Sequence, residues 1–204
     1  MRRKVFDLIA SSAGLVIVVV LLVAGGLLAW GESFTSSSVH NQLAYQQIYF
    51  PTKAQILTKG SENYPERSFL LPYAGQEVLD GAQANAYALK IREDIAGMPY
   101  HGVYSKLSAA AMAAKPGSAQ ATTLEADVAT AFKGVTLQGL LLEAYAFSVI
   151  GIVMFWAMIA SFCLAFIMAL LVVLGLRHAR LTTPEEELLA SRRLEARVGS
   201  TPTP

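Results

Sequence analysis

Two long stretches without a charged residue dominate the pattern of apolar and polar positions along the chain. The first covers residues 8–31 (24 residues) and the second covers residues 144–176 (33 residues). A transmembrane helix needs about 20 mostly apolar residues, so both stretches predict membrane-spanning helices. The first stretch exceeds the apolar region of a secretory signal peptide, about 7–15 residues, so we expect an uncleaved anchor.

Basic residues flank both stretches on the sides nearest the termini: Arg2, Arg3 and Lys4, then Arg177 and Arg180. Cytoplasmic flanks of membrane helices are enriched in Lys and Arg. We therefore expect residues 1–7 and 177–204 to lie in the cytoplasm and residues 32–143 to lie outside the plasma membrane. In the cytoplasmic tail, Thr183 and Pro184 predict the start of a short helix, followed by disorder.

Between the two stretches, the pattern predicts a small helical domain without a sheet. We expect helices over residues 36–50, 76–94 and 105–114. Residues 51–75, rich in Pro and Gly, are predicted to be loop. A capping-box signature, Thr122-x-x-Glu125, predicts a last helix that joins the second span. The expected fold class is an all-α membrane protein in which two transmembrane helices flank an extracytoplasmic helical domain.

The second apolar stretch is too long for a simple span. Its 33 residues form a helix of about 50 Å, against a hydrocarbon core of about 30 Å. If Trp156 marks the outer edge of the bilayer, residues 145–155 project from it and need a cover. The cover is either the outer domain or a partner, and the candidate interface residues are Phe147, Ile150, Met154 and Trp156.

Small residues recur every four positions in the second span, at Ala157, Ser161, Ala165 and Ala169. Such a stripe lets another helix backbone approach closely. It is a candidate interface with the first span or with a partner helix. The predicted partners are the lipid bilayer and other membrane protein subunits or a second copy of the chain.

Composition and motifs narrow the function further. Hydrophobic residues make up 54% and charged residues 15%, and the net charge is +1, which excludes nucleic-acid binding driven by bulk charge. His40 and His101 are conceivable ligands of a two-histidine, one-carboxylate iron site, with Glu62, Glu66, Glu77 or Asp94 as the carboxylate, but the spacing of the histidines lacks a signature. Nucleophile, phosphate-loop, dinucleotide and zinc-protease motifs are absent. We predict no catalytic, cofactor-binding or metal-binding residue.

Four blocks resemble a family of actinobacterial two-span membrane proteins of unknown function, often labelled "aromatic ring-opening dioxygenase". The blocks are residues 39–51, 73–88, 102–105 and 132–145. The likeness extends over roughly residues 1–178, and the label implies a non-haem iron enzyme. The blocks consist mostly of apolar, Gly, Tyr and Gln positions, which suit packing or recognition.

Three functions follow from these observations. The first is a non-catalytic integral membrane protein, an accessory or scaffold subunit of a larger cell-envelope complex. The second is an extracytoplasmic ligand-binding or sensory module. The third is the iron dioxygenase that the family label implies.

Overall fold

A computed structural model describes the backbone of residues 2–181 and the side chains of residues 9–177. The described backbone is helical, except for turns and one isolated antiparallel bridge between Tyr49 and Glu77. The chain divides into two compact units. The first combines residues up to Ala29 with residues from Trp156 onward, and the second is Trp30–Phe155.

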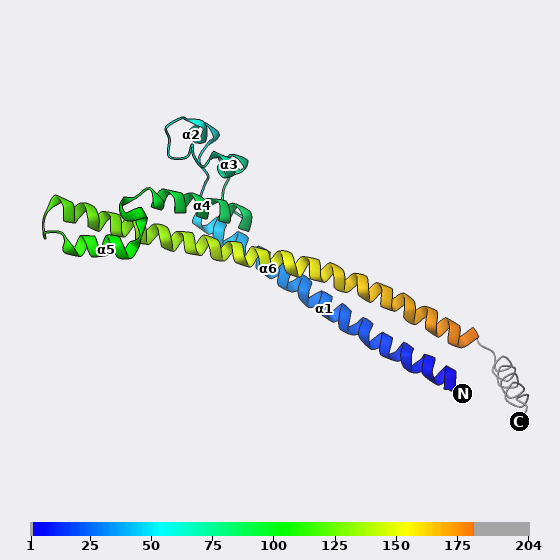
Figure 1. The fold of residues 1–204 in the computed structure, drawn as a ribbon. Coiled ribbons are helices and arrows are strands. Elements are labelled where there is room, and N and C mark those ends of the chain that lie inside the picture. Colours follow the sequence, from blue (N-terminus) through cyan, green and yellow to red (C-terminus); the bar gives the residue numbers. More distant parts are fainter. Residues whose placement is uncertain (1, 182–204) are drawn as a thin grey trace, which may run out of the picture. The chain divides into compact units, whose positions relative to one another are not determined.

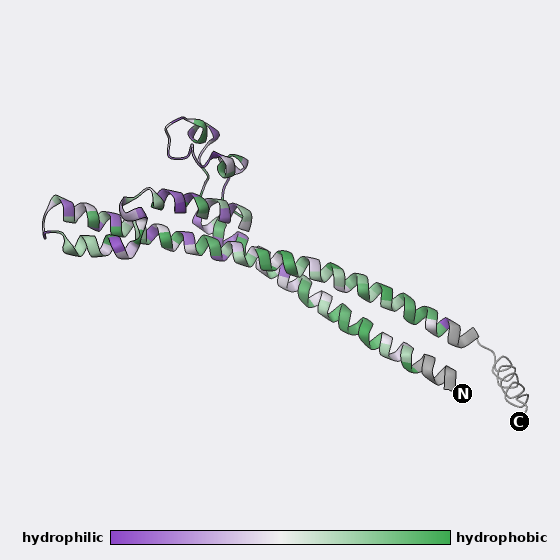
Figure 2. Ribbon diagram, viewed as in Figure 1, coloured by the Kyte–Doolittle hydropathy of each residue, from purple (hydrophilic) through white to green (hydrophobic). Residues whose placement is uncertain are grey.

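Two helices of the structure are long and apolar enough to cross a membrane. Helix α1 spans Arg2–Gln46 and helix α6 spans Ala119–Leu181. The candidate spans within them are Ile9–Gln46 and Ala119–Arg177. In the first unit, apolar residues cover nearly the whole circumference of both helices (Figure 2), which is the pattern of helices that face lipid. Two long apolar helices, predicted from the sequence, are thus present.

In the first unit, the two helices pack antiparallel. Gly14 lies so close to Val172 that an added Cβ atom would come within 2.7 Å of Val172 Cγ2. Further along α1, Gly25 lies against the ring of Phe162. Later residues of α1 therefore pair with earlier residues of α6, and at both places the missing side chain of glycine leaves room for a side chain of the other helix.

The second unit holds the short helices of the protein (Figure 1). In chain order they are α2 (Lys53–Leu57), α3 (Arg67–Leu70), η1 (Leu71–Tyr73), α4 (Gly81–Ala96), η2 (Pro99–Gly102) and α5 (Tyr104–Ala113). The end of α1 and the beginning of α6 complete this unit. The larger core cluster unites apolar residues of these elements, including Leu43, Ile56, Leu70, Val78 and Leu141. A smaller one joins α5 to α6 through Leu107, Leu124 and Ala131.

Several predicted boundaries are wrong, each for a local physical reason. Helix α1 ends at Gln46, because Gln47 adopts a left-handed φ of 49° and the chain then pairs with a later segment. The Phe50 backbone N–H donates to the Gln76 carbonyl at 2.8 Å, and the Val78 N–H donates to the Ile48 carbonyl at 2.8 Å. These bonds also explain why residues 76–79 are extended rather than helical.

Other differences concern helix starts. Helix α4 begins at Gly81, because the Asp80 side chain accepts the Gln83 backbone N–H at 2.8 Å and Gln83 completes the capping box. Helix α6 begins at Ala119, ahead of the predicted Thr122, and Ser118 Oγ accepts the Ala121 N–H at 3.2 Å. The segment 51–75, predicted to be loop, contains three short helices. The predicted tail helix lies outside the described residues.

Candidate functional site

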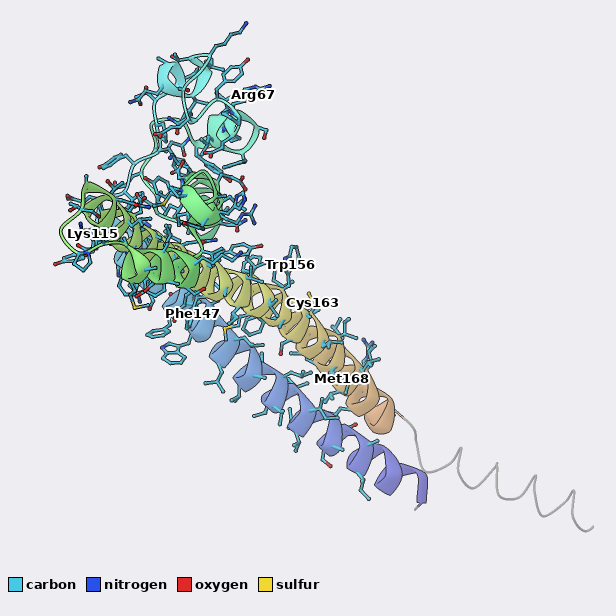
Figure 3. All side chains as sticks on the ribbon, turned by 60° about the vertical axis from the view of Figure 1, so that its left-hand side comes forward. Arg67, Lys115, Phe147, Trp156, Cys163 and Met168 are labelled. Atoms are coloured by element: carbon cyan, nitrogen blue, oxygen red, sulfur yellow. The ribbon has the colours of Figure 1, made fainter. Side chains whose placement is uncertain are left out.

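The small-residue stripe of the second span lies against α1 within the first unit. Ser161 Oγ donates a hydrogen bond to the Leu21 carbonyl at 2.7 Å, and Ala165 is only 2% exposed. Ala157 and Ala169 are half-buried. The nearby Met168 also lies close to Gly14 of α1 (Figure 3). In this structure the stripe therefore contributes to the contact between the two long apolar helices.

The other candidate interface residues lie on the part of α6 that precedes the stripe. Phe147 is 48% exposed and Ile150 is 47% exposed, and Figure 3 marks Phe147 on this part of α6. Met154 is half-buried, because its Sδ atom lies beside Gly31. Trp156, which begins the stretch of α6 in the first unit, is exposed.

Only one side of this part of α6 is covered by its own chain. Gly151 contacts the side chain of Thr35 on α1, and Ser148 contacts Gly81 at the start of α4. The remaining side carries large exposed apolar side chains at three-residue spacing: Phe147, Ile150 and Val153. We call these three residues the outer apolar face. Contiguous exposed apolar surface of this kind marks a site of interaction with another protein or with lipid.

Glu32 indicates where this face lies along the helix pair. It is the first charged residue after the apolar stretch of α1, and it lines a cavity of about 260 Å³ together with Phe155. Trp30 and Phe34 lie one helical turn apart on α1. Their exposed rings stack with centroids 5.7 Å apart. Tryptophan is enriched where membrane helices leave the bilayer.

A second feature of this unit is an acidic cavity of about 580 Å³ between α4 and the segment before α3. We call it the acidic cavity. Four carboxylates line it, together with three apolar side chains: Glu62, Glu66, Glu93, Asp94, Pro65, Phe69 and Met98. The carboxylates come from two segments, because Glu93 and Asp94 end α4 whereas Glu62 and Glu66 belong to the turns that precede α3.

Glu66 is the unusual member of this set. It is only 5% exposed, and its Oε2 atom is buried without a hydrogen-bond partner. Glu66 is the N-cap residue of α3, yet its side chain makes no capping hydrogen bond. A buried carboxylate oxygen without a donor is costly when charged, so the local fold does not explain this side chain.

Two cations partly compensate the acidic cavity. Lys90 Nζ lies 2.6 Å from Asp94 Oδ2, and Arg92 Nη2 lies 3.1 Å from Glu93 Oε1. Among the described side chains, Glu66 takes part in no ion pair. The nearest other base, Arg67, instead donates to the Tyr64 carbonyl at 2.9 Å and stacks over its ring.

The electrostatics of Glu66 follow from this environment. Burial raises the pKa of Glu66 from its ordinary 4.5 to about 7, with a further increase from the nearby Asp94 and a partial decrease from Lys90. For Lys90, burial lowers the pKa, but the hydrogen bond and charge of Asp94 outweigh it, and the net pKa is raised. Lys90 therefore stays charged, while Glu66 exchanges its proton near neutral pH.

The iron site implied by the family label does not fit the described residues. Within residues 9–177, no group of three or more His, Cys, Asp or Glu side chains is arranged to hold a metal ion. His40 is exposed and lines the cavity near Glu32, whereas His101 lies in η2 with a left-handed φ of 56°.

The sequence contained little signal for the acidic cavity. Glu62, Glu66 and Asp94 stand out in the sequence only as conceivable partners of the two histidines. The adjacent Glu93 and Asp94 resemble a solvated helix surface. No periodicity links Glu66 to α4, because the two meet only when the turns after α2 fold back. The unpaired, buried state of Glu66 is visible only in three dimensions.

Comparisons with known proteins return no relatives. No family model matches the chain, and neither a curated protein nor a solved structure matches it significantly. The described residues themselves define the class of protein: a helical protein with two helices that are long and apolar enough to cross a membrane.

Proposed function

We propose that this protein is a non-catalytic accessory or scaffold subunit of a larger complex in the plasma membrane. Its paired apolar helices anchor it with both termini in the cytoplasm, and residues 32–143 form an extracytoplasmic helical domain. The outer apolar face then docks an apolar helix of another membrane protein subunit.

One observation carries this proposal. The outer apolar face surrounds Gly151 in the sequence, and Gly151 contacts Thr35 on the covered side of α6. Thr35 follows Glu32, so the face lies at a level beyond the part of α1 that lacks charge. Phe147 and Ile150 remain about half exposed there, and Val153 is 63% exposed. A bilayer about 30 Å thick covers only about 20 residues of a helix. The excess apolar length of α6 therefore needs a protein cover.

The side chains of the outer apolar face indicate which kind of partner binds it. Its side chains are aromatic and branched aliphatic, without a charge between residues 144 and 176. A soluble peptide that matched this surface would itself be insoluble. A second membrane helix that also extends past the bilayer matches both the apolar side chains and their continuity with the span.

The test replaces Phe147 and Ile150 with Ser and extracts the tagged protein gently from its own membrane for native mass spectrometry. We expect the wild-type protein to carry a defined set of membrane subunits and the double variant to lose them. Met112→Ser is the matched control, since Met112 is an exposed apolar residue of α5. A lone wild-type protein, only a second copy of itself, or a double variant that keeps its partners contradicts the proposal.

A further inference from the structure

The acidic cavity contains more carboxylate than its own cations neutralise. Lys90 and Arg92 pair with Asp94 and Glu93, which leaves Glu62 and Glu66 as the remaining acids of the wall. Glu66 is nine-tenths buried, and its Oε2 atom has no hydrogen-bond donor. The cavity therefore lacks a hydrogen-bond donor with a positive charge, which would partner the Glu66 carboxylate.

We propose that the acidic cavity binds a small organic cation, one whose protonated amines are joined by aliphatic carbon, with Glu66 as its principal counter-charge. The amine hydrogens donate to the carboxylate of Glu66, which lines the cavity. This site is separate from the outer apolar face, so the proposal stands independently of the proposed docking function.

The geometry favours an organic cation over a metal ion. The carboxylates do not form a group of three that could coordinate a metal, among the side chains that the structure describes. The cavity volume of about 580 Å³ falls in the range of small-molecule sites, about 300–1,000 Å³. A bare ion leaves most of that space unfilled.

The apolar part of the wall also matches such a ligand. Phe69 and Met98 line the cavity beside the acids, and Phe69 packs against the main core of the unit. Aromatic faces attract ammonium groups, while a thioether adapts to aliphatic carbon. A ligand of alternating amines and methylenes thus finds a partner for each part.

The binding reaction must also account for a proton. Glu66 is faced by Glu62 from its own segment and by Lys90, Glu93 and Asp94 from α4. With the proton on Glu66 the buried oxygen is neutral, and an arriving cation displaces that proton. Because the pKa of Glu66 is about 7, binding should strengthen about tenfold between pH 6 and pH 8.

Spermidine is the probe, measured by isothermal titration calorimetry on the full chain in nanodiscs of zwitterionic lipid. We expect saturable binding to a single site at pH 8, weakened at pH 6. In Glu66→Gln, affinity at pH 8 should fall about tenfold or more and its pH dependence should disappear. Glu125→Gln, at an exposed acid of α6, is the matched control and should bind as the wild-type protein does.

Three results obtained with the wild-type protein and Glu66→Gln overturn the proposal. They are no saturable binding by the wild-type protein, unchanged affinity in Glu66→Gln, and equal displacement of spermidine by Mg²⁺ or by a Gly-Lys-Gly peptide. Circular dichroism shows whether Glu66→Gln is folded. If Glu66→Gln is unfolded, Glu62→Gln serves as the second variant, because Glu62 is an exposed residue of the same cavity wall. Unchanged spermidine binding by Glu62→Gln also overturns the proposal.

Discussion

Ser161 Oγ donates a hydrogen bond to the backbone carbonyl of Leu21, 140 residues earlier in the chain, across 2.7 Å. This bond joins the two apolar helices at a position where both are far from their ends. Ser161 is buried, and its small side chain keeps the backbones close. We predict that Ser161→Leu destabilises the helix pair by about 1–3 kcal/mol through overpacking, whereas Ser161→Ala costs about 0.6 kcal/mol.

The measurement is thermal unfolding in mild detergent, followed by circular dichroism. Leu170→Ala is the control, because Leu170 is an exposed residue of the same helix and its truncation leaves the helix contact untouched. Equal melting temperatures for Ser161→Leu and the wild-type protein contradict the packing shown by this hydrogen bond.

Gly81 and Ser148 form a second close contact, between the start of α4 and α6. A Cβ atom added at Gly81 collides with Ser148 Cβ and lies 3.4 Å from Tyr145 Cα. We predict that Gly81→Ala destabilises the second unit by roughly 1–3 kcal/mol. Gly139→Ala, where no atom lies within 4 Å of the added carbon, should not destabilise it.

A double variant separates the collision between residue 81 and Ser148 from any other effect of the alanine on stability. Combining Gly81→Ala with Ser148→Gly removes the colliding side chain and should restore part of the lost stability, although glycine within α6 costs about 1 kcal/mol. Thermal unfolding of all four proteins gives the coupling between the two sites. Purely additive effects contradict the contact.

The raised pKa of Glu66 makes the free energy of unfolding depend on pH. Its folded-state pKa of about 7 exceeds the ordinary 4.5, chiefly because of burial. The folded protein therefore holds this proton more tightly than the unfolded chain. Its contribution to the free energy of unfolding is full below pH 4.5, and it is lost as the pH rises to about 7, a change of roughly 3 kcal/mol.

Comparison with Glu66→Gln isolates this contribution from other titrating groups. The glutamine keeps the shape of the side chain and cannot ionise, so the variant should gain stability relative to the wild-type protein as the pH rises from 5 to 8. Melting temperatures at several pH values, without added amines, measure the difference. A constant difference across that range contradicts a buried acid with a raised pKa.

Cysteine labelling tests the proposed orientation. In a Cys163→Ala background, Ser105→Cys on α5 should react with a membrane-impermeant maleimide in intact cells, because Ser105 is exposed and belongs to the unit that we propose to lie outside the membrane. Ser191→Cys in the tail should react only after the cells are opened. The reverse pattern contradicts the orientation inferred from the basic flanks.

Patterns of neighbouring residues in the sequence were sufficient to predict the main helices. The charge-free stretches predicted both long apolar helices, and residues 105–114 were predicted within one residue of α5 at each end. Helix starts were less predictable. Thr122 and Glu125 have the capping-box pattern, but Ser118 caps α6 instead. Several polar residues can accept the same orphan backbone N–H groups, and the surrounding turn selects among them.

The apolar pattern along the chain already specified two candidate spans, a helical segment between them and a stripe of small residues, because each of these depends on neighbours within a few turns of helix. The pairing of Ser161 with Leu21, the half-covered state of α6 at Phe147 and the burial of Glu66 beside α4 depend on residues tens of positions apart. Such contacts form only when the turns bring distant segments together and the core packs, so the periodicity of apolar residues along the sequence does not predict them.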